Sequence, residues 1–180
     1  MKMIPDQPGT VLQWKRLKGI SPAAYELYHG HDLLARLCWT KPCGSLATGE
    51  STNGTWSLKR IGFFATQVSI RREGSESDLG LFTPNWKGDG NVTIEGGKTF
   101  HWKSDSFWKA NFTLTDEAGN VVLSMGHGGF ATLEMAQITI GSSKIDNSTL
   151  TLLAILAMYV GVLAMEDGAS MTAIIAACIS

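Results

Sequence analysis

Apolar and polar residues alternate with a period of two along most of the chain between Thr10 and Ile140, a pattern typical of half-buried β-strands. Short groups of Gly, Asn and Asp, which favour tight turns, separate the alternating stretches. The pattern predicts twelve short strands, at 10–17, 23–29, 33–39, 45–50, 55–60, 65–72, 79–83, 91–95, 98–103, 107–115, 120–125 and 130–140. Strands of this number and spacing favour a β-sandwich or a closed barrel.

The segment Leu150–Met165 breaks this pattern, because it contains no charged residue and consists mostly of Leu and Ala. That composition favours a helix, which we expect at about 148–165. The candidate N-caps are Asp146, Asn147 and Ser148, and the expected end is Glu166-Asp167-Gly168. A helix that is apolar on every side must be buried on every side, either in a protein core or in lipid.

Two arrangements would bury this helix. As a transmembrane segment, 150–165 is about 24 Å long, short of the roughly 30 Å core of a bilayer, and no cluster of Lys or Arg flanks it. As a core helix about 10–12 Å across, it suits the lumen that a barrel of more than about eight strands leaves. We therefore predict a mainly β protein, a closed antiparallel barrel of about twelve strands that encloses one C-terminal hydrophobic α-helix.

The length of 180 residues argues for a single domain, which we place at 10–167, after an N-terminal arm at 1–9 and before an apolar tail at 168–180. The tail either packs as a second helix on the barrel mouth or frays. With 44% hydrophobic residues, three Cys and a net charge of −1, the chain is not a disordered protein, a disulfide scaffold or a globally basic nucleic-acid binder.

The sequence carries no strong catalytic signature, since it has no G-x-S-x-G, H-E-x-x-H, P-loop or G-x-G-x-x-G pattern. We therefore expect a protein that is not an enzyme and uses no cofactor. His29 and His31 could bind a metal with help from elsewhere, but such pairs are usually solvated turn residues, and no metal site is predicted. The first ten residues lack the apolar region of a secretory signal, so we expect a cytoplasmic protein, free or peripheral to the membrane.

Basic residues are concentrated in the first part of the chain. Residues 1–72 carry ten Lys and Arg against four Asp and Glu, whereas 73–180 carry five against twelve. This asymmetry either marks a basic face for an anionic partner or reflects charges that solvate strand edges. The candidate basic set is Lys15, Arg16, Lys18, Arg36, Lys59, Arg60, Arg71 and Arg72.

Five members of this set are the candidate ligands of an anionic lipid or phosphate: Arg36, Lys59, Arg60, Arg71 and Arg72. If they converge on one face, their side chains would match phosphate oxygens on an anionic phospholipid or a membrane surface. Arg60 has the same parity as Trp56 and Leu58, however, so its alternative position is the rim of the barrel.

The six Trp residues divide into two groups. Five lie in strand patterns beside other apolar residues, which favours packing in the core or at the rim over stacking on nucleic acid. Trp86 lies instead in a polar loop next to Lys87. An exposed Trp beside a Lys suits an anchor at a membrane interface or on a protein partner.

Turn and aromatic motifs along the chain carry a family resemblance. The first of these motifs lies within Tyr25–Arg72 and reads Trp56-Ser-Leu-Lys59-Arg60-Ile-Gly62-Phe63. The others are Gly97…Trp102, Trp108 and Asp116-Glu117-Ala118-Gly119. With the terminal Leu/Ala helix, these pieces resemble small bacterial members of the tubby C-terminal-like superfamily, which includes phospholipid scramblases and LURP-one-related proteins. The resemblance implies a twelve-stranded barrel around a hydrophobic helix, with phosphoinositides bound by exterior Lys and Arg. The cysteine-rich anchor of scramblases is missing, and Glu166-Asp167 offers too few oxygen ligands for calcium.

Three hypotheses of function follow. The first is a non-enzymatic barrel that binds anionic phospholipid head groups or a membrane surface through a basic outer face. The second is a structural or protein-interaction module of unknown partner, and the third is a tail-anchored membrane protein in which 150–165 crosses the bilayer. The first two differ in whether the basic side chains cluster, and the third differs in whether the helix lies inside the barrel.

Leu156→Asp tests the position of the helix. If the helix is the core of the barrel, we expect no soluble folded protein, because an unpaired buried carboxylate costs several kcal/mol. Soluble expression and fractionation without detergent measure the outcome. A variant that stays folded and only leaves the membrane fraction would contradict the core position.

Overall fold

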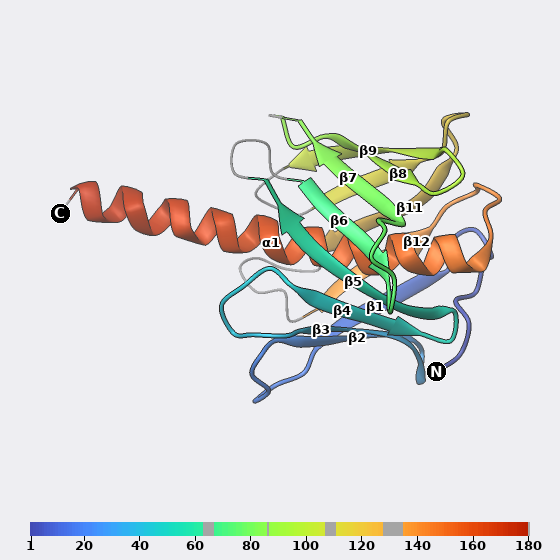
Figure 1. The fold of residues 1–180 in the computed structure, drawn as a ribbon, viewed down its shortest axis with the longest axis horizontal. Coiled ribbons are helices and arrows are strands. Elements are labelled where there is room, and N and C mark those ends of the chain that lie inside the picture. The colour runs from blue at the N-terminus through green and yellow to red at the C-terminus, as the bar shows by residue number, and fades with distance from the viewer. Residues whose placement is uncertain (63–66, 86, 107–110, 128–134, 180) are drawn as a thin grey trace.

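The computed structural model describes residues 1–62, 67–85, 87–106, 111–127 and 135–179, of which 105, 106, 127 and 168–179 are described by their backbone alone. Twelve strands form one sheet: β1 (Val11–Arg16), β2 (Ala24–His29), β3 (Asp32–Trp39), β4 (Ala47–Ser51), β5 (Gly54–Ile61), β6 (Gln67–Arg72), β7 (Gly80–Pro84), β8 (Gly90–Ile94), β9 (Lys98–Ser106), β10 (Asn111–Thr115), β11 (Val121–His127) and β12 (Met135–Ile140). Each strand pairs antiparallel with its neighbours in sequence, and β1 pairs with β12 to close the barrel (Figure 1).

One helix, α1 (Asn147–Ile179), runs through the barrel. Its first half is the centre of the core, where the fully buried side chains are Leu153, Ala154, Ile155, Leu156, Ala157, Met158 and Tyr159. The stretch Asn147–Asp167 is long and apolar enough to cross a membrane, yet 72% of its most apolar window is buried inside the protein. The predicted closed barrel with an enclosed helix is therefore confirmed, and 150–165 does not lie where the tail-anchor hypothesis needs it.

The strands lie close to the predicted ranges, because alternation records which side chains face the lumen. Trp56 and Leu58 on β5, and Phe100 and Trp102 on β9, point inward and are almost fully buried, as the alternation indicated. Parts of three predicted strands, 65–66, 107–110 and 130–134, lie outside the described residues.

The predicted end of the helix at Glu166-Asp167-Gly168 is wrong, because α1 continues to Ile179. The side chain of Asp167 forms an ion pair with Arg60 at the barrel rim, so this acidic residue is accommodated within the helix. The residues that follow carry no charge and are rich in Ala, the strongest helix former. The stretch 168–179 is therefore an extension of α1 that projects out of the barrel, and neither a second helix nor a frayed tail (Figure 1).

Of the three candidate N-caps, Asp146 caps α1. Its Oδ1 accepts a hydrogen bond from the backbone N–H of Thr149 at 2.8 Å, and its Oδ2 accepts one from the Thr149 hydroxyl. Lys98 adds an ion pair at 3.0 Å. Burial opposes ionisation, but these donors prevail and lower the pKa of Asp146 to about 2.

The helix lies closest to β3, β4 and β5 on one side of the lumen and to β11 nearly opposite them, and it lies farther from the arc of strands β6 to β10. Small inward residues, Ala35, Ala47 and Gly49, lie on β3 and β4, alongside the larger Trp39 and Trp56. A methyl group added to Gly49 would lie only 2.6 Å from Cγ2 of Ile155 on the helix. The far wall carries large aromatic side chains, Phe82, Trp102 and Phe112, which bridge the wider gap between helix and sheet.

Gly49→Ala tests this close contact. We expect it to lower the free energy of unfolding by about 1–3 kcal/mol, because the added methyl overpacks the contact with Ile155. The double variant with Ile155→Ala should be more stable than the sum of the two single effects by about 0.5–3 kcal/mol. Urea unfolding of all four proteins measures this coupling. Gly126→Ala on β11 is the matched control, because the nearest atom would lie 3.9 Å from its new methyl group. Additive effects of the Gly49 and Ile155 changes would contradict the contact.

Asp146→Asn tests the cap through its pH dependence. A carboxylate whose folded pKa is about 2, below its ordinary value, contributes stability that is full above about pH 4 and is lost as the pH falls towards 2. The variant removes this titration, so the stability difference between wild type and variant should shrink over that window. Urea unfolding between pH 2 and pH 7 measures it, with Glu76→Gln, an exposed carboxylate, as control. A difference that does not change with pH would contradict the assignment.

Candidate functional site

The barrel has two ends of different character. The carboxyl ends of β1, β3, β5, β7, β9 and β11 surround α1 where it leaves the barrel, and we call this the exit end. At the opposite end, which we call the entry end, α1 begins at Asn147. Any ligand or surface that approaches along the barrel axis therefore meets two unlike faces.

The entry end is closed and acidic. The N-terminal arm covers it, with Ile4 almost fully buried and its carbonyl accepting a hydrogen bond from Asn147 Nδ2 at 2.6 Å. Asn53 donates to Asn147 Oδ1 at 2.9 Å and so ties the β4–β5 turn to the helix start. The connections at this end carry one Lys, Lys144, against the carboxylates Glu73, Glu76, Asp78, Glu95, Asp116, Glu117 and Asp146.

The described part of the exit end carries both apolar side chains and lysines. Among the described residues, the large hydrophobic side chains exposed there are Ile20 at 49%, Leu46 at 40% and Met135 at 62%, while Met1, Met3 and Val11 are exposed towards the entry end. The exposed lysines of its described connections are Lys18, Lys41 and Lys87. An apolar surface with peripheral lysines is suited to contact with another apolar phase, and the uncharged extension 168–179 projects from its centre.

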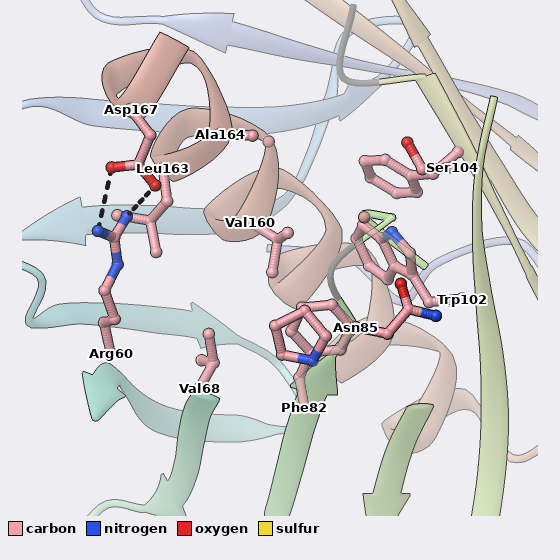
Figure 2. A pocket seen from close by; sticks show the side chains of 14 residues that line it. Arg60, Val68, Phe82, Asn85, Trp102, Ser104, Val160, Leu163, Ala164 and Asp167 are labelled. Carbon is pink, nitrogen blue, oxygen red and sulfur yellow. Dashed lines mark hydrogen bonds and ion pairs between the residues drawn. The ribbon is translucent and has the colours of Figure 1, made fainter. Parts of the chain in front are cut away.

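A cavity of about 280 Å³ opens at the exit end, between α1 and the far wall. Its lining is mostly apolar: Val68, Phe82, Pro84, Trp102, Phe112, Val160, Gly161, Leu163 and Ala164, with Arg60, Asn85, Gly88, Ser104 and Asp167. Figure 2 shows the aromatic side chains on one side and the helix on the other, with Arg60 and Asp167 at one edge. We call this cavity the exit slot. It exists because the eccentric helix presents small residues, Gly161 and Ala164, to this wall.

An ion pair lies at the edge of the exit slot. The guanidinium of Arg60 donates from Nη1 and Nη2 to the two carboxylate oxygens of Asp167, each at 3.1 Å (Figure 2). The pair is partly open to solvent, since 28% of the Arg60 side chain and 51% of the Asp167 side chain are exposed. Such a pair contributes little stability, about 0–1 kcal/mol, so another anion could replace Asp167 at low cost.

Other titratable groups beside Arg60 respond to burial. The Tyr159 hydroxyl donates to the carbonyl of Ser45, and burial raises the pKa of Tyr159 to about 12 despite the nearby Arg60. Burial also raises the pKa of Glu166, while the positive charge of Arg60 opposes that shift. Trp39 stacks on Tyr159 with centroids 5.5 Å apart, so the helix is held firmly at the level of the slot.

Two of the predicted basic ligands are engaged elsewhere on the outer surface. Arg36 donates from Nε to buried Glu26 at 2.8 Å. On the adjacent strand β4, Arg36 lies opposite a second carboxylate, Glu50. Arg71 donates from Nε to Asp78 at 2.7 Å. Each of these guanidinium groups is thus neutralised within the chain.

The remaining predicted residues do not meet on one face. Lys59 points outward from β5 and is exposed, whereas Arg60 lies at the exit end. Arg72 is the last residue of β6 and lies towards the entry end, opposite Trp56. Thus Arg36, Lys59 and Arg71 lie on the outer face of β3, β5 and β6, where the register makes Lys59 and Arg71 diagonal neighbours. Arg60 does not join them, because it occupies the rim position that its parity offered as the alternative. Of the predicted anchor, Lys87 is exposed and Trp86 lies outside the described residues.

The exit slot is a feature that the sequence analysis missed. Its residues come from β5, β6, β7, the β7–β8 connection, β9, β10 and α1, and in the sequence its apolar members resemble ordinary core residues. Within the helix the available signal was the pair of small residues Gly161 and Ala164, which is not distinctive there because Ala154 and Ala157 are also small. Small residues on a helix mark close packing as often as a cavity, so this signal could not have located the slot.

Fold and site together define a closed antiparallel barrel with a helix through its lumen, one sealed acidic end and one end with an open, mostly apolar slot. Comparisons with protein-family models, with curated proteins and with solved structures gave no match. The resemblance to tubby C-terminal-like proteins therefore stays a prediction, and the function is argued from the geometry.

Proposed function

We propose that this protein is a non-enzymatic β-barrel that binds a membrane surface through its exit end and inserts the extension 168–179 of α1 into the lipid. The proposal keeps the membrane-surface hypothesis of the sequence analysis but moves the contact from a basic outer face to the barrel end. Peripheral membrane association in the cytoplasm and kinship with tubby-like proteins belong to the same proposal.

The observation that carries the proposal is the projecting extension of α1. It has no charged residue and includes Met171, Ile174, Ile175 and Ile179, yet it lies beyond the barrel that buries the rest of the helix. A helix that is apolar all round is stable only when something apolar covers it. Twelve helical residues span about 18 Å, which is close to the depth of one leaflet in a bilayer core of about 30 Å.

The exit end supports the extension in the same orientation. Ile20, Leu46 and Met135 would enter the interface around the helix, and Lys18 and Lys41 would face the head groups. Each lysine near an anionic surface contributes about 1 kcal/mol to binding. The acidic entry end would then face water, which fixes one orientation of the barrel on the membrane.

A basic outer face is less well supported as the contact surface. Arg36, Arg60 and Arg71 are each paired with a carboxylate, and Arg72 lies at the end away from Arg60. A lipid phosphate on the outer face would have to displace two separate ion pairs, those of Arg36 and Arg71. The exit end requires no such exchange for its apolar contacts.

Vesicle flotation tests the proposal. We expect the full chain to float with phosphatidylcholine vesicles, and to bind more tightly when the vesicles also contain phosphatidylserine. Ile174→Asp combined with Ile175→Asp should lower the partition coefficient at least tenfold, because each apolar side chain buried in lipid is worth about 1.5–3 kcal/mol. Ile20→Asp combined with Leu46→Asp should lower it as well.

Val11→Asp is the matched control, since Val11 is 46% exposed but lies towards the entry end. Circular dichroism and thermal unfolding establish that each variant is folded. A soluble, monodisperse wild type that never floats would overturn membrane binding and favour the protein-interaction module. Binding that 1 M NaCl abolishes would show that charge, rather than insertion of the extension, holds the protein on the membrane.

A further inference from the structure

We propose that the exit slot binds a single alkyl chain that carries an anionic head group, with the chain between α1 and the aromatic wall and the head group on Arg60. This inference deepens the proposed function and rests on it only for the source of the ligand, because a membrane supplies such chains at the exit end. Free fatty acid and the acyl chain of a bilayer phospholipid share this chemistry.

The lining of the slot favours an apolar chain. Phe82 lies 4.9 Å from Trp102, and Trp102 lies 3.8 Å from Phe112, measured between ring centroids, so the three rings form a continuous apolar wall. Val160 and Gly161 of the helix face this wall across the cavity. Among the lining residues, the polar groups lie at the ends of the strands, where Asn85 is exposed and Ser104 half-buried.

The size of the slot limits the ligand. An apolar cavity of about 150 Å³ holds a benzene molecule. The slot, at about 280 Å³, is nearly twice as large. It therefore has room for roughly a dozen carbon atoms, which corresponds to one chain and not to a whole two-chain lipid.

The head-group position follows from the ion pair at the edge. Arg60 presents both terminal nitrogens in the planar fork that matches a carboxylate, and Asp167 now occupies that fork. A fatty-acid carboxylate or a phosphate would replace Asp167 in the same geometry. The Asp167 side chain, which is half exposed, would then turn to solvent.

Binding of a chain series tests the slot. Saturated fatty acids of eight to sixteen carbons displace the fluorescent fatty acid cis-parinaric acid from the full chain in the absence of vesicles. We expect affinity to rise about fourfold for each added methylene group and to level off near twelve carbons. A matching series of neutral alcohols should bind more weakly and show the same plateau.

Variants separate the chain from the head group. Gly161→Leu fills the slot and should lower fatty-acid affinity at least tenfold while the melting temperature stays equal or rises. Arg60→Gln should weaken fatty acids several-fold without affecting alcohols, whereas Asp167→Asn, which removes the competing carboxylate, should tighten fatty acids. Arg71→Gln, far from the slot, is the matched control for the loss of an Arg. Should Gly161→Leu fail to fold, Ala164→Leu one turn later fills the same slot.

The result that would overturn the proposal is fatty-acid binding that is absent, or unchanged in folded Gly161→Leu or Ala164→Leu. Phosphatidylcholine vesicles identify the source: if their acyl chains enter the slot, they displace cis-parinaric acid from wild type. Displacement by free fatty acid alone would assign the slot to free fatty acids. Ile20→Asp combined with Leu46→Asp, if it loses vesicles but keeps fatty acid, would refute the membrane contact and leave the slot standing.

Discussion

The structure depends on one constraint, the burial of an uncharged helix inside a closed sheet. Twelve strands enclose a lumen too wide for their own side chains to fill, and the helix is too apolar to be exposed to water. Each element therefore supplies what the other lacks. Leu153 to Tyr159 are fully buried only because the sheet closes, and the sheet is filled only because the helix runs through it. The cap at Asp146, and Asn53 with the N-terminal arm, fix the depth at which the helix starts.

The eccentric position of the helix divides the lumen into two unequal sides. Small residues on β3 and β4 let the helix approach the near wall, and Gly49 leaves no room there for even one methyl group. The far wall needs aromatic side chains to bridge the gap, and near the exit end they do not bridge it completely. The exit slot is thus a consequence of how the helix is seated. The same seating aligns the slot, the Arg60–Asp167 pair and the projecting extension at one end of the barrel.

Most of the fold could be predicted from local patterns. Alternation located the strands because every second side chain faces the lumen and must be apolar, whatever it packs against there. Trp56 and Leu58 illustrate this. The Leu/Ala segment indicated a buried helix for a similar reason. The end of the helix could not be predicted in this way. Glu166-Asp167-Gly168 has the composition of a helix end, but α1 continues through it to Ile179, with Asp167 paired to Arg60 on β5.

The sequence by itself determined the strand periodicity, the apolar helix and the excess of acidic residues in the second part of the chain, because these properties belong to single segments. Only the tertiary structure decided that Arg60 lies at the rim while Arg72 lies towards the other end, and that Arg36 and Arg71 are neutralised by Glu26 and Asp78. These positions and ion pairs depend on strand register and barrel closure, which bring together segments far apart in the chain. No local pattern encodes them, and the exit slot follows from them as well.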